Sequence, residues 1–104
     1  MIFMKKLKLM PDYECFPIWE IYEDGVENIN PRDLNISEDL KALLDKWRKE
    51  YDATLNSADP VNSGFNSEKE EEEFVRNGEK LYEELTNELG SEYIVYFMKE
   101  PGST

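Results

Sequence analysis

The chain has 104 residues, with 24 acidic and 12 basic side chains, a net charge of −12 and no histidine. A length near the common domain size predicts one domain over residues 1–104, with residues 101–104 as a frayed tail. A charge of this sign and size repels nucleic acid and anionic membranes and favours a basic partner. Cys15 is the sole cysteine, so an internal disulfide is excluded and the reducing cytoplasm is the expected compartment.

The N-terminal third is expected to form strands. From about Met4 to Met10 lysines alternate with leucines, which is the period of a half-buried strand, and the apolar run is too short for a secretion signal. The β-branched and aromatic run from Ile18 to Tyr22 predicts a second strand, with Ile18 and Trp19 on opposite faces. Asp24-Gly25 is typical of a two-residue hairpin, so a short return strand is predicted after it.

Two helices are expected next. Ser37 is a good N-cap for the first helix, whose apolar stripe at helical spacing is Leu40, Leu43, Leu44, Trp47, Tyr51 and Leu55. The stretch from Asn56 to Asn66 is rich in turn formers and predicts a long loop. Ser67 opens a capping box for a second helix that ends at Gly90. Its expected buried positions are Phe74, Gly78, Leu81, Tyr82, Leu85 and Leu89. A glycine on that stripe predicts a close helix or sheet contact.

The last apolar run, Tyr93 to Met98, has the strongest strand propensity in the chain and suits a sheet interior. The expected fold is therefore α+β. A small, antiparallel-rich sheet of three or four strands carries both helices on one face, in the order β-β-(β)-α-α-β. We expect the last strand to return beside the first.

The sequence offers little for catalysis. Histidine, the most common general base, is absent. Cys15 has Glu14 beside it, which is expected to raise the thiol pKa, so Cys15 is interpreted as a small core residue. Asp59 begins a stretch that resembles a calcium loop, but the ligand oxygen at its third position and the terminal glutamate are missing. We expect no enzyme, no cofactor and no metal. A hydrolytic activity would depend on carboxylates that no motif assigns.

The second predicted helix supplies the strongest candidate surface. From Ser67 to Gly90 it carries nine acidic residues against three basic ones, which is half of the net charge. The run Glu70 to Glu73 spreads around the helix, as on a solvated face, whereas other acidic residues share one side. Trp19 could serve as an interface anchor, because tryptophan is enriched at hot spots. The candidate partner-binding residues are Glu68, Glu72, Glu79 and Glu83 on the helix, with Glu27, Asp33, Asp59 and Trp19 elsewhere.

Three stretches carry a family resemblance: Met10 to Trp19 (MPDYECFPIW), Trp47 to Asn56 (WRKEYDATLN) and Asp59 to Phe65 (DPVNSGF), which precedes the Glu-rich helix. Together they resemble small bacterial immunity proteins of contact-dependent growth inhibition and related polymorphic-toxin systems. The resemblance implies stoichiometric inhibition of the toxic C-terminal domain of a neighbour's secreted effector. Such toxins are often nucleases with basic clefts, which an acidic surface would complement. The folds in this group vary, so the resemblance carries over no functional residues.

Two functions remain open on the sequence. The first is an immunity protein that binds one cognate toxin domain in a 1:1 complex, with a basic nuclease, and within that class a ribonuclease, as the favoured partner. The second is an acidic regulatory or interaction module with no toxin partner, whose charge only keeps its surface solvated. Neither function involves nucleic acid or membrane as a direct partner, and a monomer is favoured for the free protein.

Overall fold

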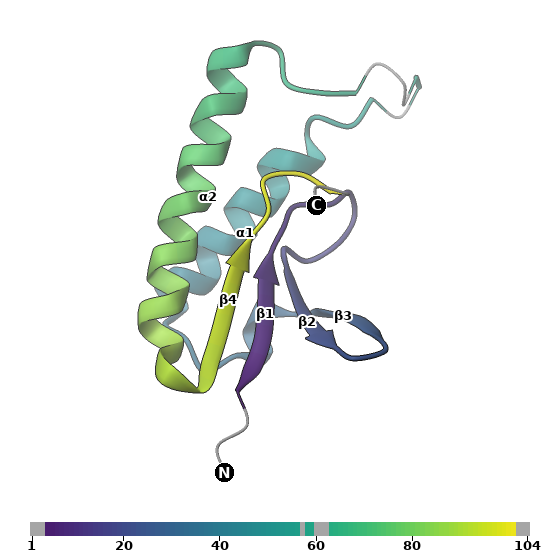
Figure 1. The fold of residues 1–104 in the computed structure, drawn as a ribbon. Helices are drawn as coiled ribbons and strands as arrows, with labels where there is room; N and C mark the ends of the chain where they lie inside the picture. The colour runs from purple at the N-terminus through teal and green to yellow at the C-terminus, as the bar shows by residue number, and fades with distance from the viewer. Residues whose placement is uncertain (1–3, 57, 60–62, 102–104) are drawn as a thin grey trace.

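A computed structural model describes residues 4–56, 58–59 and 63–101 of the chain. Figure 1 shows a sheet with two helices beside it. The strands are β1 (Lys5–Leu9), β2 (Ile18–Tyr22), β3 (Gly25–Ile29) and β4 (Tyr93–Phe97), and the helices are α1 (Glu38–Asp52) and α2 (Glu68–Leu89). The α+β class and the order of the elements are as predicted. Part of the expected long loop, at residues 57 and 60–62, and residues 102–104 of the expected tail lie outside the described residues.

The sheet has the strand order β3-β2-β1-β4 in the described part of the chain. β1 pairs with β2, and β2 with β3, in antiparallel fashion, whereas β1 and β4 are parallel. The last strand therefore returns beside the first, as predicted. Its predicted place in the sheet interior is wrong, because β4 is an edge strand. α2 packs against one face of β4 and buries Val95 to 7% exposure, which accounts for the apolar residues on that face.

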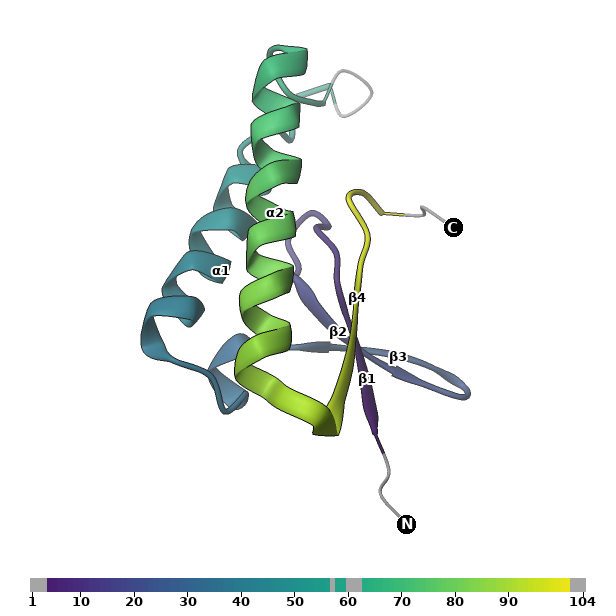
Figure 2. The same ribbon diagram turned by 60° about the vertical axis from the view of Figure 1, so that its left-hand side comes forward.

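Both helices lie on the same side of the sheet, and the core fills the space between the two layers (Figure 2). The alternation along β1 puts Leu7 and Leu9 into this core, and their exposed fractions are 1% and 0%. These two residues point to the same face of β1 because successive side chains of a strand alternate between faces. The core residues are Leu7, Leu9, Ile18, Ile36, Leu40, Leu44, Trp47, Phe74, Leu81, Leu85 and Val95.

Gly78 lies where α2 comes closest to its neighbours, which confirms the predicted close contact. A Cβ atom at this position would lie 2.6 Å from Cζ2 of Trp47 and 2.9 Å from Cε1 of Phe97. Trp47 is a core residue, as predicted, with 2% exposure. Its indole N–H donates to the carbonyl of Phe74 at 2.9 Å, and the two rings stack at a centroid distance of 4.5 Å. The absent side chain at Gly78 thus makes room for the indole.

The helix starts agree with the predicted caps. The side chain of Ser37 accepts from the amide of Leu40, and that of Ser67 accepts from the amide of Glu70, each at 3.1 Å. These bonds satisfy amides that have no partner within the first helical turn. Ser37 also donates to Glu88 near the end of α2, from its amide at 2.5 Å and its hydroxyl at 2.8 Å. Glu88 therefore fastens the end of one helix to the beginning of the other.

Three local predictions need correction. α1 ends at Asp52, so Leu55 lies beyond the helix on whose stripe it was placed. Leu43, also expected in the buried stripe, is 45% exposed, because α2 and the sheet cover a narrower side of α1 than the stripe spans. Tyr22 pairs with Gly25, so the hairpin turn consists of residues 23–24, one position before the predicted turn.

Candidate partner-binding surface

Four of the predicted binding residues form one line along α2. Glu68, Glu72, Glu79 and Glu83 follow one another at intervals of four or seven residues, which places them on one side of a helix. All four are exposed. We call this line the acidic stripe. Phe74, Leu81 and Leu85 point into the core from a different side of the same helix. The amphipathic pattern that buries α2 therefore also sets the stripe toward solvent.

The surroundings of the acidic stripe are mostly acidic, with two basic exceptions. Glu68, Glu72 and Glu79 line a shallow depression, to which Arg76 of α2 and Lys99, just after β4, also contribute. The depression extends from the outer side of α2 to the C-terminal end of the edge strand. Two cations within this surface leave its net charge negative. It is open enough to meet a protein surface and too shallow to enclose a small ligand.

Carboxylates on α1 behave differently. Asp45 contacts Arg48 at 2.8 Å and Lys49 at 3.1 Å, and Arg48 also lies 3.6 Å from Asp52. The hydrogen bond from Arg48, and then that from Lys49, lowers the pKa of Asp45 below its ordinary value. With the pair of Lys41 and Glu38, these contacts are all the ion pairs found within the described residues. The four carboxylates of the acidic stripe take part in none of them.

The other predicted acidic residues are scattered. Glu27 lies on β3, the edge of the sheet opposite β4, where it accepts a hydrogen bond from the hydroxyl of Tyr22 at 3.1 Å. Asp33 ends the 3₁₀ turn that precedes α1, and Asp59 lies in the loop between the two helices. All three are exposed. Figure 1 shows that the β2–β3 hairpin lies across the sheet from α2, so Glu27 does not continue the acidic stripe.

Trp19 lies on the face of the sheet that carries no helix. It pairs with Lys8 of β1 and is half-buried. Its indole N–H donates to the carbonyl of Met10 at 3.2 Å, and Nζ of Lys8 lies 5.8 Å from its ring centroid. Trp19 and Glu27 point to opposite faces, because their strand positions alternate. The predicted binding residues therefore fall on more than one surface.

Cys15 is half-buried rather than part of the core. Burial raises the pKa of its thiol, and the carboxylates of Asp12, Asp52 and Glu14 raise it further, in that order. The direction is the one that the sequence predicts, although Glu14 is the smallest of the causes. Because only the thiolate is a strong nucleophile, this environment makes Cys15 less reactive.

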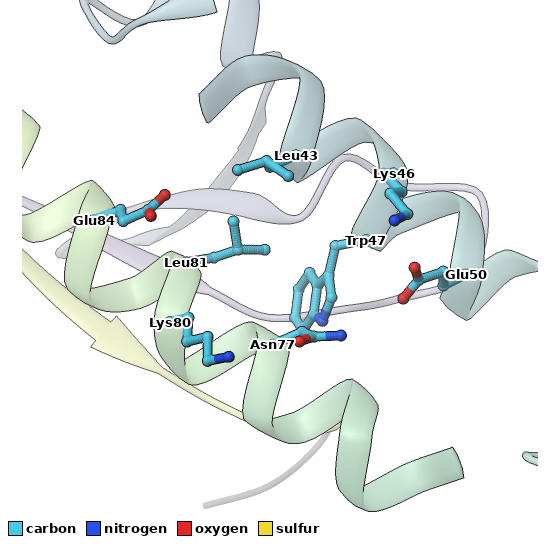
Figure 3. A pocket seen from close by; sticks show the side chains of 8 residues that line it. All are labelled: Leu43, Lys46, Trp47, Glu50, Asn77, Lys80, Leu81 and Glu84. Carbon is cyan, nitrogen blue, oxygen red and sulfur yellow. The ribbon is translucent and has the colours of Figure 1, made fainter. Parts of the chain in front are cut away.

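The structure adds a groove that the sequence did not indicate. It runs between α1 and α2, has a volume of about 200 Å³, and has Trp47 and Leu81 at its floor. Figure 3 shows Leu43 beside this floor, with charged residues around it. The rim carries two lysines and two glutamates: Lys46, Lys80, Glu50 and Glu84. Its charges balance, so it provides no electrostatic preference for one partner. The exposure of Leu43 is the signal that would have indicated this groove, and the spacing of apolar residues along the sequence does not give the exposure of a side chain.

Residues 5–100 match the family model described as Serratia CdiI immunity protein-like. The chain belongs to this family of immunity proteins. The resemblance seen in the sequence is thereby confirmed, and it extends over nearly the whole chain. A comparison with curated proteins found no match. Membership implies that this immunity protein has a cognate toxin, which it neutralises.

The described part of the immunity protein shows neither a metal-binding cluster nor a membrane-spanning helix. The residues described contain no group of three or more cysteine, aspartate or glutamate side chains placed to hold a metal ion. Within the same residues, no helix is both long and apolar enough to cross a membrane.

Proposed function

We propose that this immunity protein neutralises its toxin by binding the toxic domain in a 1:1 complex, with the acidic stripe against a basic cleft. The acidic stripe is the observation that supports the proposal most directly. Its four exposed carboxylates have no ion-pair partner in the described part of the chain, so a basic surface would not have to displace an internal contact. A cleft that binds nucleic acid presents the complementary charge, because it must neutralise phosphates. We therefore infer a nuclease, and favour a ribonuclease, as the toxin.

The proposed inhibition is stoichiometric and non-enzymatic. Negative charge from the stripe would occupy the positions in which the toxin holds phosphates, and the toxin would then be unable to bind its substrate. Charge complementarity mainly raises the association rate and selects the partner. An immunity protein benefits from both effects, because it must capture a toxin before the toxin acts. The compartment proposed for this encounter is the cytoplasm.

Calorimetric titration of the immunity protein into the toxin domain encoded beside its gene tests this proposal. We expect tight 1:1 binding that weakens with added salt. The double variant Glu79→Lys with Glu83→Lys should bind at least about tenfold more weakly, because reversed charges face a cleft of the same sign. The single variant Glu79→Lys should also bind more weakly than wild type. Its matched control is Glu73→Lys, which makes the same charge change on another side of α2. Thermal unfolding confirms that each variant is folded.

The outcomes separate the two functions left open by the sequence. Loss of affinity in the stripe variants, with Glu73→Lys near wild type, would support the stripe as the binding surface. Unchanged affinity in the double variant would remove α2 from the interface. If the wild-type protein failed to bind the toxin domain at any salt concentration, the proposed partner would be wrong and an acidic interaction module would be the better interpretation.

A further inference from the structure

In the described part of the chain, no helix lies on the face of the sheet that points away from α1 and α2 (Figure 2). Strand register places eight residues on it in two rows across the sheet. One row runs through Ile94, Lys6, Ile21 and Val26, and the other through Tyr96, Lys8, Trp19 and Asn28. We call these eight residues the open face. Tyr96 is 45% exposed and Val26 is 51% exposed, which makes them two of the most exposed large apolar side chains described.

The charge of the open face is opposite to that of the protein. Each row has one lysine at its centre, and neither row contains a carboxylate. Acidic residues outnumber basic ones two to one in the whole chain. The open face reverses this balance, because its eight residues include two lysines and no acidic residue. Glu20 and Glu27, which pair with one another across β2 and β3, both lie on the other face. Both glutamates of the strands thus lie on the face toward the helices, whereas two of the three strand lysines, Lys6 and Lys8, lie on the open face.

We propose that the open face is a second docking surface for the toxin domain, and that it receives an apolar patch bordered by carboxylates. This inference rests on the proposed function, because it assigns a second contact to the same partner. A patch of aromatic and aliphatic side chains around two lysines fits the usual anatomy of an interface, with an apolar centre and charges that set the partner's orientation.

The aromatic residues of the open face are suited to act as anchors. The ring of Trp19 is held by its hydrogen bond to the carbonyl of Met10 and lies under Nζ of Lys8. Because the ring is already fixed, little conformational entropy is lost when a partner covers it. Tyr96 stands in the same row, on the other side of Lys8. Tryptophan and tyrosine are the residue types that most often dominate binding energy at interfaces.

One partner can reach both surfaces because they meet at β4. Tyr96 and Ile94 present the open face on this edge strand, and Lys99, just after it, lines the same depression as Glu72 and Glu79 of the acidic stripe. A toxin domain that grips the β4 edge would contact the stripe on one side and the open face on the other. Opposite charges on the two sides would also fix its orientation.

Other occupants fit the open face less well. In a symmetric contact between two copies, the central lysines of one open face would meet those of the other, which is repulsive. Single-stranded nucleic acid could stack on Trp19 and Tyr96, but two lysines offset few phosphates and the net charge of −12 opposes its approach. A protein patch with carboxylates at its border gains from the lysines and avoids most of the net repulsion.

Titration of the toxin domain with three variants tests the inference. Lys6→Glu reverses a charge on the open face, and Tyr96→Ala removes an exposed ring. Lys5→Glu is the matched control, because Lys5 is the exposed neighbour of Lys6 on the opposite face of β1. We expect Lys6→Glu and Tyr96→Ala to weaken binding by about tenfold or more, and Lys5→Glu by less than about threefold. Lys6→Glu decides the test if Tyr96→Ala fails to fold.

Each result separates the inference from the proposed function. If Lys6→Glu binds as tightly as wild type while the stripe variants bind weakly, the inference is wrong and the proposed function stands. If the wild-type protein does not bind the toxin domain, the proposed function is wrong and the inference is wrong with it. Sedimentation and a titration with a single-stranded RNA oligonucleotide complete the test. Self-association, or RNA binding, that Lys6→Glu abolishes would assign the open face to another occupant and overturn the inference.

Discussion

The two helices pack in the same way but differ in the charge of their solvent-exposed sides. α1 and α2 each bury one apolar side against the sheet and each other, around Trp47 and Gly78. On its solvent side α1 carries five acidic and four basic residues and pairs several of them, whereas α2 carries nine acidic and three basic residues. Burial explains both helices equally well. It does not explain the charge of α2, and this difference is the reason to connect α2 with a partner.

The largest effect is expected where the helices share a contact. Gly78→Ala should lower the free energy of unfolding by about 1–3 kcal/mol, because the new methyl group would overlap the rings of Trp47 and Phe97. Asn77→Ala is the control, since this exposed neighbour can only gain helix propensity. Urea unfolding measures both. Equal stability of Gly78→Ala and wild type would show that α1 and α2 can move apart at little cost.

A smaller loss is expected at the other junction between the helices. Glu88→Ala removes the acceptors for the amide and hydroxyl of Ser37 and should cost about 1 kcal/mol, as for the loss of a helix cap. Glu88→Gln keeps an acceptor oxygen and should cost less. This acidic residue of α2 is thus distinguished from the stripe, because its carboxylate stabilises the fold. Thermal unfolding of the two variants in parallel would show whether that distinction is valid.

The ion pairs of Asp45 should make a small part of the stability of the fold depend on pH. The pKa of Asp45 is lowered in the folded state from its ordinary value of 3.8. Its ion pairs therefore contribute stability above that value, and the contribution is lost as the pH falls through the folded pKa. Asp45→Asn should cost a few tenths of a kcal/mol at neutral pH, with the difference from wild type disappearing in acid. A difference that persisted at low pH would point to packing rather than charge.

The smallest effect should have the opposite sign. Glu83→Gln removes a negative charge four residues after Glu79, where two like charges on one side of a helix repel each other. We expect it to raise the free energy of unfolding by a few tenths of a kcal/mol and to weaken toxin binding. A carboxylate that lowers stability but strengthens binding behaves as functional residues typically do. A loss of stability in Glu83→Gln would place Glu83 among the structural carboxylates with Glu88.

Local patterns in the sequence predicted most of the elements. Alternation along β1 and the serine caps of both helices depend on near neighbours, so they can be recognised without the fold. The end of α1 could not be recognised in this way. There the amide of Thr54 donates to the carbonyl of Tyr51 at 3.0 Å, and its hydroxyl donates to the same atom at 2.7 Å. This local turn interrupts the helix before Leu55, although the apolar spacing continues.

The two candidate surfaces differ in how visible they are in the sequence. The acidic stripe lies within one helix, so its spacing alone reveals it. The open face joins residues of all four described strands, and it exists only because Lys8 pairs with both Trp19 and Tyr96. The alternation of lysines and leucines in the sequence predicted that Lys6 and Lys8 lie on one face of a strand. The antiparallel register with β2 places Trp19 beside Lys8, and the parallel register with β4 places Tyr96 there; no short-range signal encodes either register.

That parallel pairing also decides when the protein can protect its cell. Leu7 of β1 has Val95 of β4 as its partner, so the sheet is completed only after β4 has been synthesised. Contacts between such distant residues form slowly, because a long loop must close before they contribute stability. A nascent chain that contains only β1, the β2–β3 hairpin and α1 cannot yet form the complete sheet. We therefore expect protection to depend on a reserve of finished molecules rather than on synthesis begun when a toxin arrives.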